Sequence, residues 1–116
     1  MNFSFQKSEK LKSRKTIERL FTEGKSYSKF PIKVFFLPIE KAKKNQAGFA
    51  VPKRNFKKAV DRNRIKRQMR EAYRLQKHLL KNETGLNFAI FFLYIGKEKL
   101  HYSKIETAME SLIKKL

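Results

Sequence analysis

The 116-residue chain has no cysteine and no tryptophan, a single aspartate, four glycines and three prolines. Without cysteine it cannot form a disulfide, a zinc finger or a thiol nucleophile. Its longest apolar run, residues 88–95, is far shorter than the roughly 20 residues that a helix needs to span a bilayer. The N-terminus has no apolar stretch typical of a secretory signal. We therefore expect a cytoplasmic protein with no membrane partner.

Acidic side chains are too few and too scattered to hold catalytic metal ions. Asp61 is the only aspartate, and nine glutamates are spread along the chain. Metal-dependent hydrolysis of a phosphodiester usually needs several converging carboxylates. His78 and His101 lack ligand spacing, and the four glycines are too far apart for a phosphate-binding loop. If the protein takes part in catalysis, we expect the reactive centre to belong to another molecule, with no cofactor bound by protein side chains alone.

Basic residues are abundant, with 29 Lys and Arg against 10 Asp and Glu and a net charge of +19. Such a charge repels itself and indicates a polyanionic partner. The composition, 41% hydrophobic and 13% aromatic, is too apolar for a disordered tail. We expect one nucleic-acid-binding domain over residues 1–116, in which residues 1–12 form a basic arm. Nucleic acid fits better than an anionic membrane, because the basic residues lie within a globular pattern.

Apolar periodicity predicts six elements along the chain. A helix over 14–23 begins after Ser13 as N-cap and ends at Gly24. Strands over 30–38 and 47–51 are predicted to form an antiparallel hairpin with a charged loop at 41–45. A long helix over 56–80, a central strand over 86–95 with apolar residues on both faces, and a helix over 102–116 follow. The order α-β-β-α-β-α predicts an α+β fold, a two-layer sandwich of helices on a small mixed sheet.

The long helix carries most of the charge, since residues 53–81 hold twelve Lys or Arg and two acids. Opposite its apolar stripe, at helical spacing, lies a row that we call the basic ridge: Asn63, Arg67, Arg70, Arg74 and Lys77. A solvated helix face usually mixes charges of both signs, and like charges one turn apart destabilise a helix. The planar guanidinium suits bidentate contact with phosphate. The ridge therefore favours a phosphate-rich partner.

Three further basic residues flank the apolar stripe of the same helix. They are Arg62, Lys66 and Arg64. Their aliphatic stems could cover the core while the charged groups reach solvent. Two roles stay open for them, contact with nucleic acid and local structural support.

A continuous stretch of the long helix reads Val60-Asp61-Arg62-Asn63-Arg64-Ile65-Lys66-Arg67 and leads into Arg70-Glu71-Ala72-Tyr73. It resembles the signature Arg-Asn-Arg helix of the bacterial ribonuclease P protein subunit. Earlier parts of the chain also resemble that family, namely Leu11-Lys12, Phe21, Gly24 and Gly48-Phe49-Ala50-Val51 followed by Lys53-Arg54. Order, spacing, length and charge agree over nearly the whole chain.

The resemblance implies a fold and a reaction. The fold contains a βαβ unit with a left-handed crossover, similar to domain 2 of ribosomal protein S5. The reaction is endonucleolytic removal of the 5′ leader from precursor tRNA by a ribonucleoprotein. The catalytic RNA subunit, bound one to one, would carry the active site and its Mg²⁺ ions. The protein would aid the folding of that RNA and recognise the precursor tRNA.

The resemblance also assigns residues to two sets. Those expected to face the catalytic RNA are Arg62, Asn63, Arg64, Lys66, Arg67 and Arg70, joined by Arg74 from the ridge. Lys53, Arg54 and Lys58 would lie near the junction with the substrate. Ile17, Phe21 and Phe35 would line a cleft for the single-stranded leader, whose bases stack on aromatic rings; plain core packing is the alternative. Ile17 and Pro52 depart from the family pattern, which often has an aromatic residue and a serine there.

Two other functions share the charge and the size. A structural ribosomal protein that binds ribosomal RNA would have the same α+β character, and it would cosediment with ribosomal subunits. A DNA-binding module could place the arginine-rich helix in a major groove. The chain has no dimerisation heptad and no short helix-turn-helix pattern, which disfavours the DNA-binding class.

Overall fold

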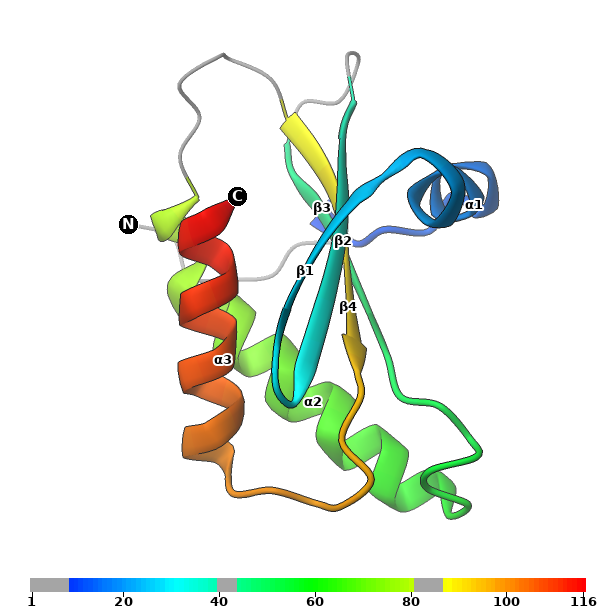
Figure 1. Cartoon of the computed structure of the whole chain (residues 1–116), viewed down its shortest axis with the longest axis vertical. Helices are drawn as coiled ribbons and strands as arrows, with labels where there is room; N and C mark the ends of the chain where they lie inside the picture. Colours follow the sequence, from blue (N-terminus) through cyan, green and yellow to red (C-terminus); the bar gives the residue numbers. More distant parts are fainter. Residues whose placement is uncertain (1–8, 40–43, 81–86) are drawn as a thin grey trace.

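The computed structural model describes residues 9–39, 44–80 and 87–116 (Figure 1). Its helices are α1 (Arg14–Glu23), α2 (Ala59–Gln76) and α3 (Tyr102–Lys115), and a short 3₁₀ turn, η2 (Lys77–Leu79), follows α2. Its strands are β1 (Lys25–Lys29), β2 (Ile32–Ile39), β3 (Gln46–Ala50) and β4 (Asn87–Tyr94). Most of the predicted arm (1–8), residue 40 with part of the predicted charged loop (41–43), and residues 81–86 lie outside the described residues.

The four strands form one mixed sheet in the order β1-β2-β4-β3. α2 and α3 cover one face, and α1 covers part of the other (Figure 1). β4 is antiparallel to β2 and parallel to β3, so β3, α2 and β4 form a βαβ unit. The α+β prediction and the central position of β4 are confirmed. Alternate residues of β4 enter two different cores, which explains its apolar character on both faces.

The pairing of the strands corrects one prediction. The predicted strands 30–38 and 47–51 correspond to β2 and β3, but they do not form a hairpin, because β4 lies between them. The hairpin is instead β1–β2, joined at Phe30 and Pro31. β1 has the sequence KSYSK and is exposed along its whole length. An exposed, lysine-bearing edge strand lacks the apolar alternation by which a strand is recognised, so the sequence did not predict it.

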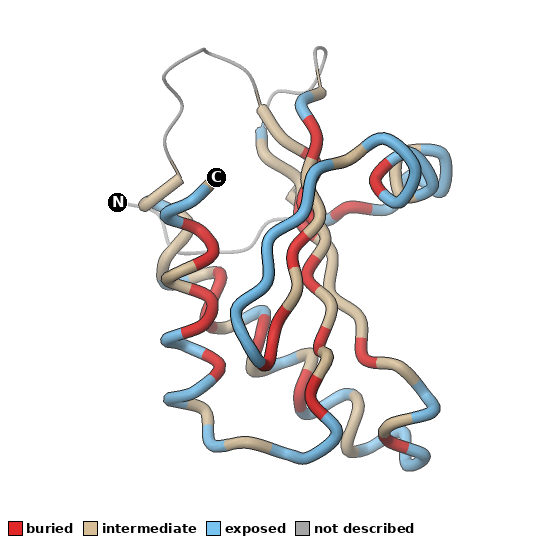
Figure 2. Tube along the Cα trace, in the orientation of Figure 1, coloured by how far each residue is buried: buried red, intermediate tan, exposed pale blue. Residues whose placement is uncertain are grey.

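Two apolar cores hold the layers together. The larger core fills the space between the sheet and the helices α2 and α3, and the smaller lies under α1. Figure 2 shows buried residues along the sheet and on the inner sides of α2 and α3. The small core consists of Leu11, Leu20, Leu37 and Ala89. Leu11 belongs to the end of the predicted arm, and its N–H donates to the carbonyl of Ala47 at 2.9 Å, so this part of the arm is tied to β3.

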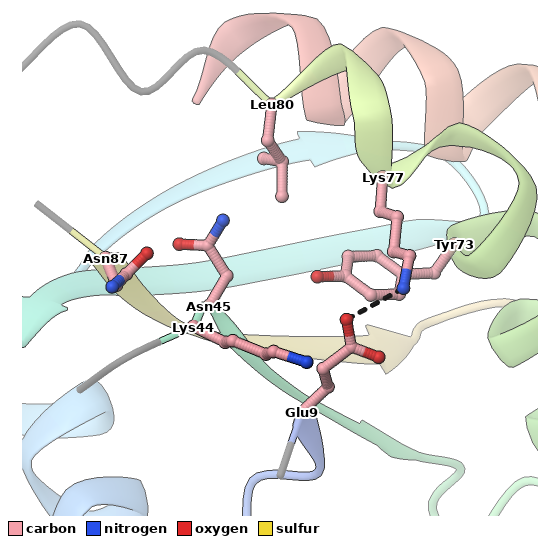
Figure 3. Close-up of a pocket in the computed structure, with 7 residues that line it drawn as sticks. All are labelled: Glu9, Lys44, Asn45, Tyr73, Lys77, Leu80 and Asn87. Atoms are coloured by element: carbon pink, nitrogen blue, oxygen red, sulfur yellow. Dashed lines mark hydrogen bonds and ion pairs between the residues drawn. The ribbon is translucent and has the colours of Figure 1, made fainter. Parts of the chain in front are cut away.

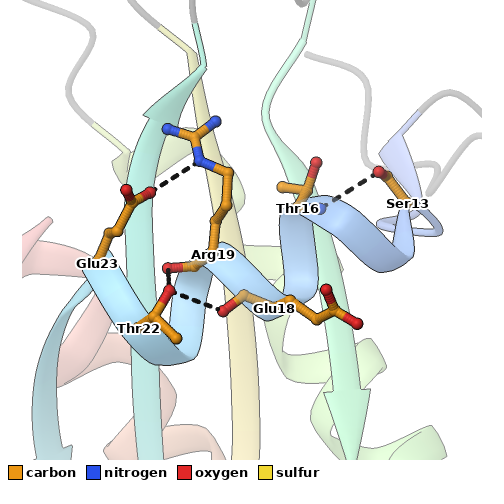
Figure 4. Close-up of polar contacts among 6 residues, drawn as sticks. All are labelled: Ser13, Thr16, Glu18, Arg19, Thr22 and Glu23. Atoms are coloured by element: carbon orange, nitrogen blue, oxygen red, sulfur yellow. Dashed lines mark hydrogen bonds and ion pairs between the residues drawn. The ribbon is translucent and has the colours of Figure 1, made fainter.

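The first helix begins and ends where the sequence predicts. The Ser13 hydroxyl accepts from the N–H of Thr16 at 3.3 Å (Figure 4). Arg19 and Glu23 form an ion pair one turn apart. At the C-terminus, the Gly24 backbone is extended (φ −71°, ψ 156°), and its N–H donates to the carbonyls of Arg19 and Leu20. A Cβ on Gly24 would lie 2.4 Å from the Leu20 carbonyl oxygen. Glycine is thus required by close packing rather than by a left-handed turn.

Candidate nucleic-acid interface

The exposed face of α2 carries the first part of the basic ridge. Ile65, Met69, Ala72 and Tyr73 are buried on the opposite face. Asn63, Arg67 and Arg70 are exposed, and so is Arg64 beside them. The predicted orientation of α2 is therefore confirmed. Lys66, on the flank, is half-buried.

The C-terminal part of the ridge is bound to acidic side chains. Arg74 forms a two-pronged pair with Glu71, with Nη2–Oε1 at 2.5 Å and Nε–Oε2 at 3.1 Å. The hydrogen bond from Arg74 holds the pKa of Glu71 below its ordinary value. Lys77 Nζ lies 2.7 Å from Glu9 Oε1, and these side chains are only 15% and 13% exposed. The ridge does not extend along the whole helix as an open basic face, because its last two members have acidic partners.

Lys77 belongs to a pocket at the end of α2 (Figure 3). The pocket has a volume of about 350 Å³ and is lined by Glu9, Lys44, Asn45, Tyr73, Lys77, Leu80 and Asn87. Burial, aided by the charge of Glu9, raises the pKa of the Tyr73 hydroxyl, which stays neutral at ordinary pH. Asn45 Oδ1 accepts from the N–H of Phe88 at 2.7 Å. These contacts join the arm to the end of α2 and the segment before β3 to β4, which is a structural role.

Arg62 supports the segment that leads into α2. Its Nη1 donates to the carbonyls of Phe56 at 2.7 Å and Lys57 at 2.9 Å. The N-cap of α2, Lys58, makes no side-chain capping bond. A cation is disfavoured at a helix N-terminus, and these two hydrogen bonds offset that cost. Of the two roles left open for Arg62, the structure shows local support, while its contact with RNA stays a prediction.

We expect Arg62→Ala to lower the free energy of unfolding by about 1–2 kcal/mol, because two carbonyls lose their charged donor. Thermal unfolding of the protein alone measures this effect. Arg67→Ala, which removes an exposed arginine of the same helix, is the matched control and should change stability by less than about 0.5 kcal/mol. Equal melting temperatures for the two variants would contradict the support role.

The segment between β3 and α2 displays a second group of cations. Val51 and Phe56 are buried and anchor its two ends. Between and after them, Lys53, Arg54 and Lys58 are exposed. This segment lies at the end of the sheet where β3 and β4 both finish, because these two strands run parallel.

A cluster of aromatic rings, which we call the cleft after the predicted leader site, lies where α1 meets the other face of the sheet. The Phe21 ring is 4.9 Å from that of Phe35 and 5.4 Å from that of Phe91, centre to centre and edge-on. Ile17 and Phe35 are half-buried, whereas Phe21 is 51% exposed. The structure thus brings together Ile17, Phe21 and Phe35. Phe91 joins them and was missed from the sequence, although its alternation with buried Phe92 indicates that it faces the other way.

Basic residues lie next to the cleft along two borders of the sheet. On the part of this sheet face that α1 leaves uncovered, the half-buried Lys33 and Leu93 lie between the cleft and the end of the sheet where Lys53 and Arg54 lie. Around the edge strand β3, a pocket of about 210 Å³ is lined by Lys10, Leu11, Lys12, Ala47, Gly48, Phe49 and Arg70. Cations of the arm and of α2 therefore meet at this edge. A Cβ on Gly48 of this pocket would lie 3.2 Å from the Phe91 ring, so Arg70 of the ridge and the cleft border the same edge strand.

In the part of the chain that the structure describes, no three His, Asp or Glu residues gather in a way that could hold a metal ion. The same part has no helix long and apolar enough to cross a membrane.

The family model for ribonuclease P matches residues 5–116. The chain belongs to the ribonuclease P protein family. A ribonuclease P protein component from Porphyromonas gingivalis is 39% identical over 118 residues, covering 97% of this chain and 86% of that protein. Another, from Dictyoglomus thermophilum, is 44% identical over 85 residues, covering 72% of this chain and 68% of that protein.

Solved structures show the same fold in this family. The ribonuclease P protein from Thermotoga maritima superimposes with a TM-score of 0.77 at 25% identity, covering 93% of this chain and 97% of that one. The protein from Staphylococcus aureus also gives a TM-score of 0.77, at 21% identity, covering 91% and 93%. As a ribonuclease P protein component, the chain takes part in an endoribonuclease complex and has an RNA partner. The family match favours this identity over a ribosomal protein or a DNA-binding module.

Proposed function

We propose that this ribonuclease P protein component binds the catalytic RNA through α2 and the 5′ leader of precursor tRNA through the aromatic cleft. In this way it promotes endonucleolytic 5′ maturation of tRNA. The observation that carries the proposal is that exposed Arg70 of α2 meets Lys10 and Lys12 of the arm at the edge strand β3, where Gly48 lies against the Phe91 ring of the cleft.

The exposed part of α2 suits the backbone of a structured RNA. Arg67 and Arg70 lie about one turn apart, and each guanidinium can make a bidentate contact with a phosphate. Arg64 extends this face toward the start of the helix. The opposite face of α2 is buried in the larger core, so the helix holds these cations on a rigid support.

The cleft suits an unpaired strand. Phe21 presents a half-exposed ring with Phe35 and Phe91 beside it, and bases stack on such rings with little regard to sequence. Lys33 Nζ lies 5.1 Å from the centre of the Phe35 ring, where its charge is available to a phosphate of the same strand. A strand that follows the uncovered sheet face would arrive at Lys53 and Arg54, which we place near the junction of leader and tRNA.

The active site would belong to the RNA, one copy of which would bind one copy of the protein. Among the residues that the structure describes, no three acids or histidines gather, and several carboxylates pair with basic side chains, as Glu9 does with Lys77, Asp61 with Lys99 and Glu71 with Arg74. Such isolated carboxylates do not form the converging set that holds catalytic Mg²⁺. The metal ions would therefore be bound by RNA groups, and the protein would supply no catalytic residue.

We expect a tagged copy of the chain to recover one predominant RNA from its own cells, and sequencing identifies that RNA. The purified protein, freed of RNA, should leave precursor tRNA intact, because its described residues form no cluster that could hold a metal ion. Protein and recovered RNA together, with Mg²⁺, should cut the precursor at the mature 5′ end, with activity saturating at one protein per RNA. Enrichment of ribosomal RNA instead would contradict the proposal, and cleavage by RNA-free protein would contradict the accessory role.

A further inference from the structure

The segment between β4 and α3 separates two pockets that the ridge and the cleft do not include. On one side lies an apolar pocket of about 330 Å³, lined by Phe30, Ile95, Lys97, Glu98 and Leu100. On the other lies a cationic pocket of about 260 Å³, lined by Arg64, Ile65, Gln68, Lys99, Leu100 and His101. Leu100 borders both pockets, so they adjoin one another.

The apolar pocket presents an aromatic ring to solvent. Phe30 is 66% exposed, more than any other large aromatic side chain among the described residues. Its position is held by the backbone, since the N–H of Ile95 donates to the Pro31 carbonyl at 2.8 Å. The Tyr94 hydroxyl donates to the Glu98 carbonyl at 2.6 Å and fixes the segment that faces the ring. An exposed ring on a fixed support offers a face on which a base can stack.

The cationic pocket offers donors from two elements. Lys99 Nζ donates to Asp61 Oδ1 at 3.2 Å, and an ammonium group has three hydrogens. His101 caps α3, with Nδ1 accepting from the N–H of Ser103 at 3.3 Å. Because Nδ1 accepts, the neutral imidazole carries its hydrogen on Nε2, which can donate to an anion. Arg64 is exposed and contributes a guanidinium from α2.

We propose that this segment binds one unpaired nucleotide of the catalytic RNA, with the base against Phe30, Ile95 and Leu100 and a phosphate at Arg64, Lys99 and His101. A nucleotide has a flat base, which suits the apolar pocket, and an anionic phosphate, which suits the adjoining cationic pocket. The RNA subunit is the source rather than the leader, because Arg64 and the first turn of α2, to which Lys99 is bound, lie across the sheet from the cleft. This inference rests on the proposed function.

The test measures binding of the RNA subunit alone to variants of the full chain. Phe30→Leu keeps apolar volume and removes the ring face, so affinity should fall roughly five- to thirtyfold with an unchanged salt dependence. Phe30→Tyr retains the ring and should bind as the original chain does. Lys99→Gln should weaken binding and reduce the slope of log affinity against log salt by about one unit. His101→Asn should weaken it while still capping α3.

Lys114→Gln is the matched control for Lys99→Gln. Both lysines are about half exposed, at 59% and 52%, and each pairs with one acid. The control should leave binding nearly unchanged. Equal effects of the two substitutions, or affinity that is insensitive to Phe30→Leu, would overturn the inference.

Two further results separate the possible failures. If Arg67→Ala weakens RNA binding while the Phe30 and Lys99 variants do not, the inference fails and the proposed function stands. If none of the three variants alters RNA binding, the proposed function fails with it. If the variants weaken binding of precursor tRNA but leave binding of the RNA subunit intact, the bound nucleotide belongs to the leader. That result would overturn its assignment to the RNA subunit.

Discussion

Replacing Arg67 and Arg70 together with alanine is expected to weaken binding of the catalytic RNA roughly 100-fold at moderate salt. Each arginine lies exposed on α2, and we expect each to donate charged hydrogen bonds to phosphate worth about 1.5 kcal/mol. For the original chain, about six phosphate contacts should give a slope of log affinity against log salt on the order of −4 to −5. The magnitude of this slope should fall by about one to two units in the double variant. Titrations at several salt concentrations give both quantities.

The control for this pair must remove the same charge elsewhere. Lys114 and Lys115 are exposed at the end of α3, outside the proposed interface. Their replacement with glutamine lowers the net charge equally and should change the slope little. If both double variants gave the same slope, the RNA would be attracted by total charge, and the assignment of α2 would be wrong. Melting temperatures should stay close to that of the original chain, since all four side chains are exposed.

Replacing Phe21 or Phe35 with leucine is expected to weaken binding of precursor tRNA by the holoenzyme by about 1–2 kcal/mol, or roughly five- to thirtyfold. Leucine keeps most of the apolar volume but has no ring face on which a base can stack. Mature tRNA, which has no leader, should bind as before. Phe21→Leu is the sharper of the two tests, because half of the Phe21 surface is already exposed and little core packing is lost.

A purely structural role for these rings predicts another pattern. Phe92 lies in the larger core on the opposite face of β4, and it provides the control. Phe92→Leu should lower the melting temperature while leaving the ratio of precursor to mature tRNA affinity unchanged. If the Phe21 and Phe35 variants lose affinity for precursor and mature tRNA equally, the cleft does not bind the leader. The assignment of α2 to the catalytic RNA would still stand.

Much of the architecture follows from local sequence. Ser13 and Gly24 mark the ends of α1, the spacing of Ile65, Met69 and Tyr73 orients α2, and apolar residues on both faces mark β4 as central. These signals depend on the geometry of a single element, because a helix or strand repeats its exposure with its own period. The exposed cations of α2 could be recognised for the same reason, since they lie opposite a stripe that must be buried.

Tertiary structure decides which elements pack against one another and which side chains they bring into contact. β4 separates β2 from β3, and no local pattern of the three strands states that order. Lys77 is held by Glu9, which lies 68 residues away along the chain, and Phe91 completes the cleft from a strand distant from α1. The sequence places Arg62 on the flank of the apolar stripe and leaves two roles open for it, whereas the folded chain shows that it lies where the carbonyls of Phe56 and Lys57 converge. Periodicity specifies which face of an element is buried, whereas long-range packing selects what covers that face and which charges acquire partners.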